Sequence, residues 1–329
     1  MKQLFILLIL TAFGLQNCNV VTSGAWIDEN IDQSLKNEIK TLDEKVIEAI
    51  TSSNSSLVKS MMPDKVLEKS GQNIDQSIEQ MGKATRGTDF HILNQFHVKN
   101  STTGIGNTVM SGVSGQNDYI IHYQALNIEM FISLLITTNG LDDFLLTNIY
   151  GKYPDGWKLN ILQFGQYKIN GQTATELYSK AKKEYDKGYL VDAANNMILS
   201  SKVANPANRF WQYQKEEEMN QFYETLMAEI KTKYIFPLVV ENIDTKPQVL
   251  NIYPFGMQEG YFPMVEYITN IELEDTVKTK VENDLIHKSI GEIFTGLDKE
   301  KKFVFYMAYS EIPNGKTPVP AYGFVKEIK

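Results

Sequence analysis

Carboxylate and tyrosine side chains are the candidates for acid–base chemistry in this sequence. Four of them fall on or beside two neighbouring segments that we predict to be strands: Asp118, Tyr119, Tyr123 and Glu129. A tyrosine and a carboxylate that share an apolar cup could act on an enolisable substrate. Ile121 lies between the two tyrosines, so the same segment also fits an ordinary buried strand face. Asp118, Tyr123 and Glu129 are therefore candidates for catalysis, with a position in the core or at its rim as the alternative.

Two histidines, His91 and His97, lie on one predicted strand together with Asp89. Alternation places all three side chains on one face, as a metal site would need. Same-face residues six apart on a strand are separated by about 20 Å, however, and one ion cannot bridge that distance. We expect the solvated face of an edge strand here, with no bound metal and no cofactor.

An aromatic segment in the last third of the chain is the candidate binding loop. Tyr253, Phe255 and Tyr261 lie close together there, among prolines and glycines. Tyrosine and phenylalanine rings offer large, rigid contact areas, so this loop could stack against a sugar ring or a peptide. Alternatively, it is a hairpin whose rings cap the domain core or seal that domain against the helical segment before it.

The local motifs of common enzyme classes are missing from the sequence. It contains no Gly-x-Ser-x-Gly elbow, His-Glu-x-x-His pair, phosphate-binding loop, Cys-x-x-Cys pair or Gly-x-Gly-x-x-Gly turn. These absences favour a non-catalytic protein. An acid–base site assembled from separate strands leaves no such motif, so an enzyme is the alternative.

The N-terminus has the pattern of an export signal. A lysine precedes an apolar run over residues 4–10, which is too short for the roughly 20 apolar residues of a spanning helix. Cys18, the only cysteine, follows at the end of this region, so no intramolecular disulfide can form. Leu15 matches the lipobox of bacterial lipoproteins, whereas Asn17 departs from its usual small residue. The segment thus resembles a lipoprotein signal, with an ordinary secretory signal and an incidental cysteine as the alternative.

The resemblance to lipoproteins implies a membrane anchor. Residues 1–17 would be removed, and acyl chains on Cys18 would hold the mature chain in a membrane leaflet. Asn19 stands where an aspartate often marks inner-membrane retention, so we expect the outer membrane, with the protein facing the periplasm. Residues 18–29 are predicted to form a polar tether that reaches at most about 36–40 Å.

Net charge argues against nucleic acid as a partner. The chain has a formal net charge of −8 and only two arginines, Arg86 and Arg209. Acidic proteins are repelled by polyphosphates, and arginine forks are what recognise phosphate best. The hydrophobic fraction of 43% in 329 residues is enough for two domains with separate cores.

Residues 30–170 are predicted to form an α+β domain. Apolar residues at helical spacing predict a helix over 32–51, a short helix ended by Pro63 and a third helix through 74–81. The pattern then alternates, which predicts a series of strands: 90–98, 107–114, 118–125, 127–138, 143–151 and 157–168.

Two segments of this domain resemble the nuclear transport factor 2-like or SnoaL-like cone. Residues 46–62, VIEAITSSNSSLVKSMM, are similar to its first helical pair, and residues 155–164, DGWKLNILQF, to its closing strand. The resemblance covers about residues 28–170 and implies helices packed on a curved antiparallel sheet. Members of that superfamily include isomerases, cyclases, transport factors and domains without a known reaction, so no single function is implied.

A helical connector is predicted over residues 171–234. Thr173 and Glu176 have the spacing of a capping box, and Gly188 is placed to end the first of three helices. Residues 174–207 resemble one tetratricopeptide repeat, without a second copy in the sequence. A single such hairpin cannot bury its own faces, so it must dock within the chain or on a partner.

Residues 235–329 are predicted to form a second α+β domain, in which one helix covers one side of an antiparallel sheet. The helix spans about residues 275–291. Apolar residues at helical spacing mark its predicted inner face: Val277, Val281, Leu285 and Ile290. Residues 303–309 are apolar on both faces, which predicts a central strand.

These patterns together predict an α+β protein with two sheet domains and a helical connector. We expect a membrane-anchored envelope lipoprotein that acts as a non-catalytic binding or assembly module, with the membrane and an envelope protein as partners. Two alternatives are open. One is an isomerase- or hydrolase-like enzyme that uses the pocket of the cone-like domain, and the other is a glycan or peptide binder that uses residues 253–262.

Overall fold

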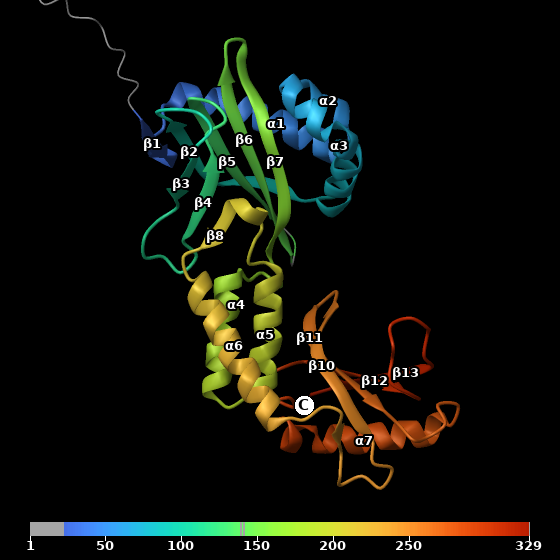
Figure 1. Ribbon diagram of the computed structural model, residues 1–329. Helices are drawn as coiled ribbons and strands as arrows, with labels where there is room; N and C mark the ends of the chain where they lie inside the picture. Colours follow the sequence, from blue (N-terminus) through green and yellow to red (C-terminus); the bar gives the residue numbers. More distant parts are fainter. Residues whose placement is uncertain (1–22, 139, 141, 329) are drawn as a thin grey trace, which may run out of the picture.

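The computed structural model describes residues 23–328 except 139 and 141 (Figure 1). The predicted signal, Cys18 and the first part of the predicted tether therefore lie outside the described residues. A membrane-crossing helix is not found in the described part of the chain, where every helix is too short or too polar to span a bilayer.

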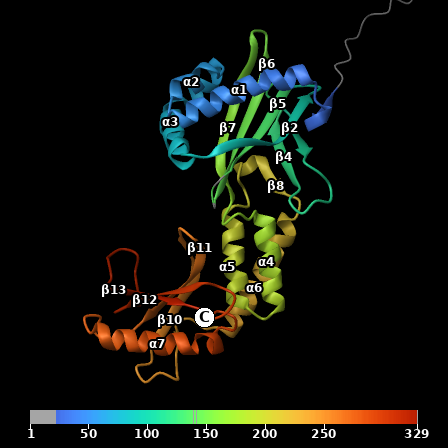
Figure 2. The same ribbon diagram turned by 180° about the vertical axis from the view of Figure 1, so that it is seen from behind.

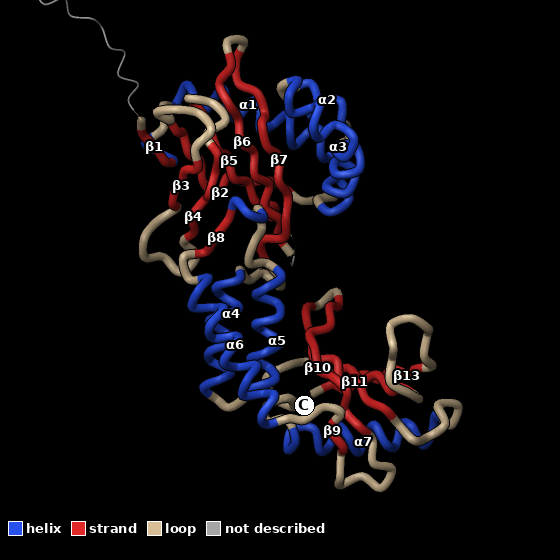
Figure 3. Tube along the Cα trace, in the orientation of Figure 1, coloured by secondary structure: helices blue, strands red, loops and turns tan. Residues whose placement is uncertain are grey.

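The described chain has the predicted α+β fold. Helices and three mostly antiparallel sheets form two helix–sheet regions, and a helical connector lies between them (Figures 1 and 3). The view from behind shows the two regions at opposite ends of the connector (Figure 2).

A five-stranded antiparallel sheet organises the first region. Its strands, in spatial order, are β1 (Gly24–Ile27), β2 (Asp89–Lys99), β5 (Glu129–Thr138), β6 (Asp143–Tyr153) and β7 (Gly156–Lys168). Three helices pack on one face: α1 (Gln33–Thr51), α2 (Ser55–Ser60) and α3 (Asp64–Ala84). A small sheet packs on the other face: β3 (Gly106–Met110), β4 (Tyr119–Gln124) and β8 (Trp211–Tyr213). Both faces of the large sheet are therefore covered.

Helix α1 shows why the helical layer forms where the sequence predicts it. The Asp32 side chain caps the helix by accepting hydrogen bonds from the backbone amides of Ser34 and Leu35. In the apolar stripe of α1, Ile39 and Val46 are fully buried against the sheet, while Leu35 and Leu42 are half-buried. The three predicted helices and the predicted strands of this region are confirmed, mostly with shifts of a few residues at their ends, although α3 begins at Asp64, ten residues before the predicted segment.

Residues 24–27 overturn part of the predicted tether, because they form β1 and pair antiparallel with β2. The Trp26 ring stacks on His97 with 5.1 Å between ring centroids, and the Lys99 ammonium lies 5.9 Å from the Trp26 ring centroid. A free sheet edge and a stacking partner order a segment whose composition alone predicts a flexible tether.

A bulge in β2 separates the two histidines that simple alternation places on one face. The register of β2 against β5 shifts around Leu93, which is the extra residue of the bulge. Alternation restarts beyond a bulge with the opposite parity. His91 and His97 consequently point to opposite faces of the sheet, and the prediction of a shared face is wrong.

The helical connector consists of α4 (Ala174–Asp186), α5 (Leu190–Lys202) and α6 (Glu216–Lys233), with β8 and a 3-10 turn, η2 (Asn208–Phe210), between the last two. The predicted capping box is confirmed, because Thr173 and Glu176 each accept a hydrogen bond from the other's backbone amide. Gly188 ends the first helix with a φ of 79°. Strand β8 is a new finding, and it ties the connector to β4 of the first region.

The second region contains another five-stranded sheet. Its strands, in spatial order, are β13 (Ala321–Glu327), β12 (Phe303–Tyr309), β11 (Gly260–Ile268), β10 (Gln248–Met257) and β9 (Leu238–Val239). Strand β12 is central, as predicted, but it runs parallel to β11. Helix α7 (Thr276–Ile293) makes the crossover between these two strands and covers one face of the sheet (Figure 1).

Helix α7 contradicts its predicted inner face at three of the four residues and confirms it at Ile290, which is fully buried. Val277, Val281 and Leu285 are exposed by 73%, 55% and 42%. Glu282 and Asn283 face the sheet and are almost completely buried. The second half of α7 packs its isoleucines into the core and so fixes the rotation of the whole helix, which leaves the apolar stripe of the first half in solvent.

Candidate functional site

Hydrogen bonds hold the predicted catalytic residues apart. The Asp118 carboxylate accepts from the backbone amides of Ser114 and Gly115, and this closes the turn before β4. The Tyr123 hydroxyl donates to Asn100 Oδ1 at 3.1 Å. Asp118 and Tyr123 therefore serve the turn and the core between the two sheets of the first region.

Tyr119 and Glu129 make their contacts with other residues of the molecule. The Tyr119 ring stacks on Trp211 at 3.7 Å, and its hydroxyl donates to Asn94 Oδ1 at 2.5 Å. Burial raises the pKa of Tyr119 well above its ordinary value of 10.0, so this hydroxyl stays protonated at neutral pH. Glu129, the first residue of β5, has its Oε1 2.8 Å from Nε2 of His97, which lies near the end of β2 in the large sheet. These side chains do not converge on one cup.

A buried carboxylate that the sequence analysis missed lies between α1 and the sheet. Asp43 is 3% exposed and accepts three hydrogen bonds, from Ser133 at 2.6 Å, Asn148 at 2.8 Å and Tyr150 at 2.7 Å. Burial raises the pKa of Asp43, and the three donors oppose that shift. Its place in the apolar stripe of α1, four residues after Ile39, is the signal that could have found it.

The cleft between α3 and β7 has the features of a binding site. Its volume is about 860 Å³, and it lies between the helical layer and the end of the sheet, next to η2. Ten of the described side chains that line it are apolar, among them Ile78 on α3, Phe164 on β7 and Phe210 in η2. Six others are uncharged polar groups, including the amides of Asn160 and Gln163. The lining is amphipathic, with its apolar part contributed by both layers.

Arg209 is the one charged side chain among the described residues that line this cleft. It lies in η2 directly after Asn208, whose φ of 51° bends the backbone there and whose amide donates to Gln163 at 2.9 Å. The guanidinium lies 5.2 Å from the Phe210 ring centroid. Within the described residues no carboxylate lies at ion-pair distance from it, whereas Lys301 and Lys187 each pair with an acid.

The aromatic residues of the predicted binding loop are divided between two faces of the C-terminal sheet. Tyr253 and Phe255 lie on the face away from α7, paired across the ladder with Met264 and Phe262. Tyr261 lies on the opposite face and packs towards the connector, where the Lys202 ammonium is 6.0 Å from its ring centroid. The three rings therefore do not form a single platform.

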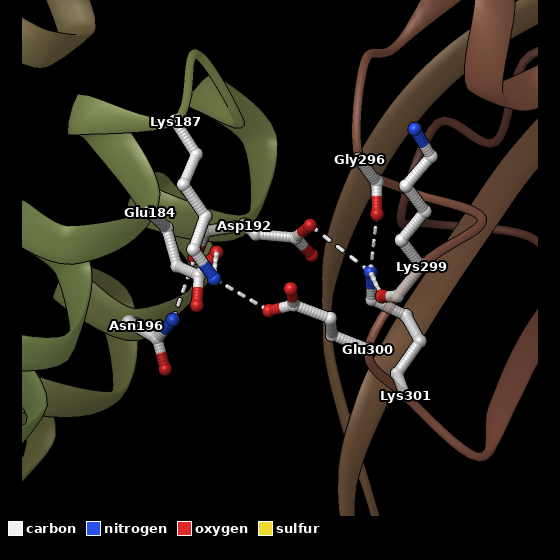
Figure 4. Close-up of polar contacts among 8 residues, drawn as sticks. All are labelled: Glu184, Lys187, Asp192, Asn196, Gly296, Lys299, Glu300 and Lys301. Carbon is white, nitrogen blue, oxygen red and sulfur yellow. Dashed lines mark hydrogen bonds and ion pairs between the residues drawn. The ribbon is translucent and has the colours of Figure 1, made fainter.

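A polar crevice of about 90 Å³ separates the connector from the C-terminal region (Figure 4). The Lys301 ammonium donates to Asp192 Oδ2 at 3.0 Å, and Lys187 pairs with Glu300 across the same crevice. Burial raises the pKa of Asp192 to about 6, and Lys301 opposes that shift. Asn195 is 7% exposed with no partner for its side-chain amide among the described residues. The crevice is too small for most ligands, and its two ion pairs join the connector to the C-terminal region.

The protein-family models, the curated proteins and the solved structures were each compared with this chain. None of them matches it.

The chemistry open to the cleft is binding. Among the described residues that line it there is no carboxylate, histidine or cysteine, so no pair of groups is present that could exchange a proton with a substrate near neutral pH. No group of three or more potential metal ligands occurs within the described part of the chain either. From its described residues the cleft offers an apolar wall, several amides and one cation without an acidic partner.

Proposed function

We propose that the chain is a lipid-anchored envelope protein that binds an anionic amphiphile in the cleft between α3 and β7. The ligand is an apolar chain with a single anionic group. The observation that carries the proposal is the combination of ten apolar side chains with one arginine that has no acidic partner among the described residues.

The two parts of the cleft supply affinity in different ways. Transfer of apolar groups from water to an apolar wall stabilises a complex by about 0.8 kcal/mol for each methylene. A charge-assisted hydrogen bond from a guanidinium adds about 1.5–3 kcal/mol and selects for an anion. The cleft volume of about 860 Å³ falls within the range of small-molecule sites. A long acyl chain with a carboxylate fits both the size and the polarity.

Two expectations from the sequence support this proposal. A lipid anchor at Cys18 would hold the cleft close to a membrane, which is the source of such amphiphiles. Residues 28–170 resemble the cone superfamily, and the cleft lies between the two layers that define a cone, the helices and the sheet. A binding role in the envelope is the function that joins these features.

A fluorescence titration with cis-parinaric acid tests the proposal. The full chain is used with Cys18→Ser, which prevents acylation and removes the need for detergent. We expect saturable binding of one molecule per chain. The methyl ester, which lacks the charge, should bind at least about 10-fold more weakly because it forms no ion pair with Arg209.

Variants at the two arginines of the chain provide a matched pair. Arg209→Gln should weaken binding of the acid to the level of the ester, while Arg86→Gln makes the same change of charge away from the cleft and should leave binding unchanged. Ser77→Trp, which fills the cleft from α3, should weaken acid and ester alike. Equal affinity of wild type and Arg209→Gln for the acid would contradict the proposal that the anion binds in this cleft.

The anchor is tested separately by fractionation of envelopes. The wild-type chain should sediment with membranes and incorporate radiolabelled palmitate, because acylation at Cys18 gives it a hydrophobic anchor. The Cys18→Ser chain should be soluble and unlabelled. If both chains sediment equally, the chain is held at the membrane by something other than lipidation.

A further inference from the structure

One face of the C-terminal sheet has no helix or strand packed on it in the described part of the chain. Helix α7 covers the face that carries Tyr267 and Tyr306, and His287 on α7 lies 2.9 Å from the Tyr306 hydroxyl. Successive residues of a strand alternate between faces, so their neighbours point the other way. Figures 1 and 2 show no element over that second side.

This second side, the open face, is built from aromatic residues of three neighbouring strands and one acid. Its central members are Tyr253, Phe255, Phe262, Glu266, Phe305 and Tyr309. The rings contact one another, with 5.4 Å between the centroids of Phe255 and Phe305 and 6.1 Å between those of Phe262 and Phe305. The result is a continuous apolar face whose rings are half-buried, apart from the buried Phe305, and apolar faces that stay partly open to solvent mark interaction sites.

The open face buries some of its own residues without forming part of either hydrophobic core. Met264 is 4% exposed and Phe305 is 8% exposed, yet neither belongs to the core under helices α1 to α3 or to the core that continues from the small sheet through the connector to α7. Val325 on the neighbouring edge strand is 56% exposed. The surrounding rings shield the centre of the face only partly, which leaves apolar area available to a partner.

Glu266 lies in the middle of these rings. The hydroxyls of Tyr253 and Tyr309 each donate to its Oε1 at 3.2 Å, which fixes the carboxylate in place. Burial and the neighbouring Glu266 raise the pKa of Tyr253 to about 12, so this hydroxyl remains a donor at physiological pH. Among the described residues no lysine or arginine pairs with Glu266.

Charge and ring geometry select one occupant for this face. A carboxylate among electron-rich ring faces attracts a cation. A second copy of the chain, docked face to face, would add a second Glu266 carboxylate and no lysine or arginine among the central members of its own open face, so the acid would stay without a basic partner. A sugar stacks best on a flat exposed ring, whereas the rings here are tilted against each other, by 55° for Phe255 and Phe305.

The width of the face suits a helix. Strands lie about 4.8 Å apart, so the four long strands β10 to β13 span about 14 Å between their axes. An α-helix with its side chains is about 10–12 Å wide and would cover this face as α7 covers the other. An apolar helix surface that carries one basic residue would satisfy both the rings and Glu266.

We propose that the open face binds an amphipathic helix of a partner protein, with a lysine or arginine of that helix paired with Glu266 and its apolar residues packed on the phenylalanines. This site is independent of the amphiphile cleft, which lies in the other region of the molecule. It makes the C-terminal region the docking part of the chain and the first region the ligand-binding part.

Fluorescence anisotropy with a labelled model helix tests the docking proposal. The probe is a helical peptide panel with an apolar stripe of leucines and one lysine at successive stripe positions, and its control is the same panel with norleucine in place of lysine. We expect the full chain with Cys18→Ser to bind the best lysine peptide at least about 10-fold more tightly than its norleucine counterpart.

Two matched carboxylate variants locate the charge. Glu266→Gln should remove the preference for lysine, while Glu259→Gln, the same change at an exposed position of the β10–β11 turn, should keep it. Phe255→Ser should weaken both peptides. Arg209→Gln, which disables only the amphiphile cleft, should have no effect, so the failure of one proposal is distinguishable from the failure of the other.

Three outcomes would overturn the docking proposal. One is equal binding of lysine and norleucine peptides, or no binding of either. Another is a concentration-dependent dimer in analytical ultracentrifugation that Phe255→Ser abolishes, because it would assign the face to a second copy. The third is binding of an uncharged oligosaccharide that Glu266→Gln and Phe255→Ser both abolish.

Discussion

The two five-stranded sheets of this molecule differ in how many of their faces are covered. The first sheet has helices α1, α2 and α3 on one side and the small β3–β4–β8 sheet on the other. On one side the C-terminal sheet has α7 and, against β10, the connector helix α5, whereas no helix or strand of the described chain packs on its other side (Figure 1). Each sheet nevertheless places apolar residues on both faces of its central strands. This difference is the ground for the docking proposal, which assigns the uncovered face of the second sheet to a partner helix.

Two carboxylates, one at each sheet, differ in the same way in how far they are enclosed. Asp43 accepts from Tyr150 in a fully enclosed layer, and Glu266 accepts from Tyr253 and Tyr309 on the open face. Asp43 has three donors and is 3% exposed. Glu266 remains partly open to solvent. The enclosed acid is a structural group, while the open acid can still take a partner.

Removal of these two carboxylates should give the largest contrast. Asp43→Ala leaves three buried donors without an acceptor and should lower the free energy of unfolding by about 3–5 kcal/mol. Glu266→Ala exposes its tyrosine hydroxyls to water and should cost less than about 1 kcal/mol. Urea denaturation of the two variants at neutral pH measures both values. Similar losses would mean that the open face is as enclosed as the first sheet.

Truncation of apolar side chains should lower the unfolding free energy by different amounts in the two sheets, with a smaller difference than for the carboxylates. Leu146 is fully buried under the helices, so Leu146→Ala should cost about 2–4 kcal/mol through lost burial and a cavity. Val325→Ala on the exposed edge of the C-terminal sheet should cost less than about 0.5 kcal/mol. Thermal unfolding monitored by circular dichroism gives both numbers. A large loss at Val325 would show that its face is packed in solution.

The stability contributed by Asp192, at the contact between the connector and the C-terminal region, should depend on pH. Burial raises the pKa of Asp192 from 3.8 to about 6 in the folded chain, so the folded state binds a proton more tightly than the unfolded state. The contribution of this group to stability should therefore increase as pH falls from about 6 to about 4, by about 2 kcal/mol. The quantity to measure is the difference in unfolding free energy between wild type and Asp192→Asn across that range. A difference that does not change with pH would contradict the shift.

The sequence predicts the elements of this fold well because their signals are local. The capping box at Thr173 and the left-handed Gly188 depend only on neighbouring residues, and both are confirmed. The α3–β7 cleft is different, since Arg209 is brought beside helix α3 only by the chain path through the connector. No pattern around Arg209 shows that it has no acidic partner within the described part of the chain. The same holds for Leu93, whose bulge changes the faces of the two histidines without any local signal.

A substitution on the solvent side of helix α7 should have the smallest effect on stability. It tests which side of this helix faces the C-terminal sheet. Its periodic residues Val277, Val281 and Leu285 predict an inner face, but the fold turns them to solvent. Val281→Lys should therefore change the unfolding free energy by no more than about 0.5 kcal/mol, because no apolar contact in the core is lost.

A matched substitution on the inner side of α7 supplies the scale for that measurement. Ile290→Ala, at a fully buried position of the same helix, should cost about 2–4 kcal/mol by the loss of core packing. The two variants together determine which side of α7 contacts the sheet in solution. If Val281→Lys is the more damaging of the two, the apolar stripe of α7 is buried, and its rotation against the sheet is the one that helical spacing alone predicts.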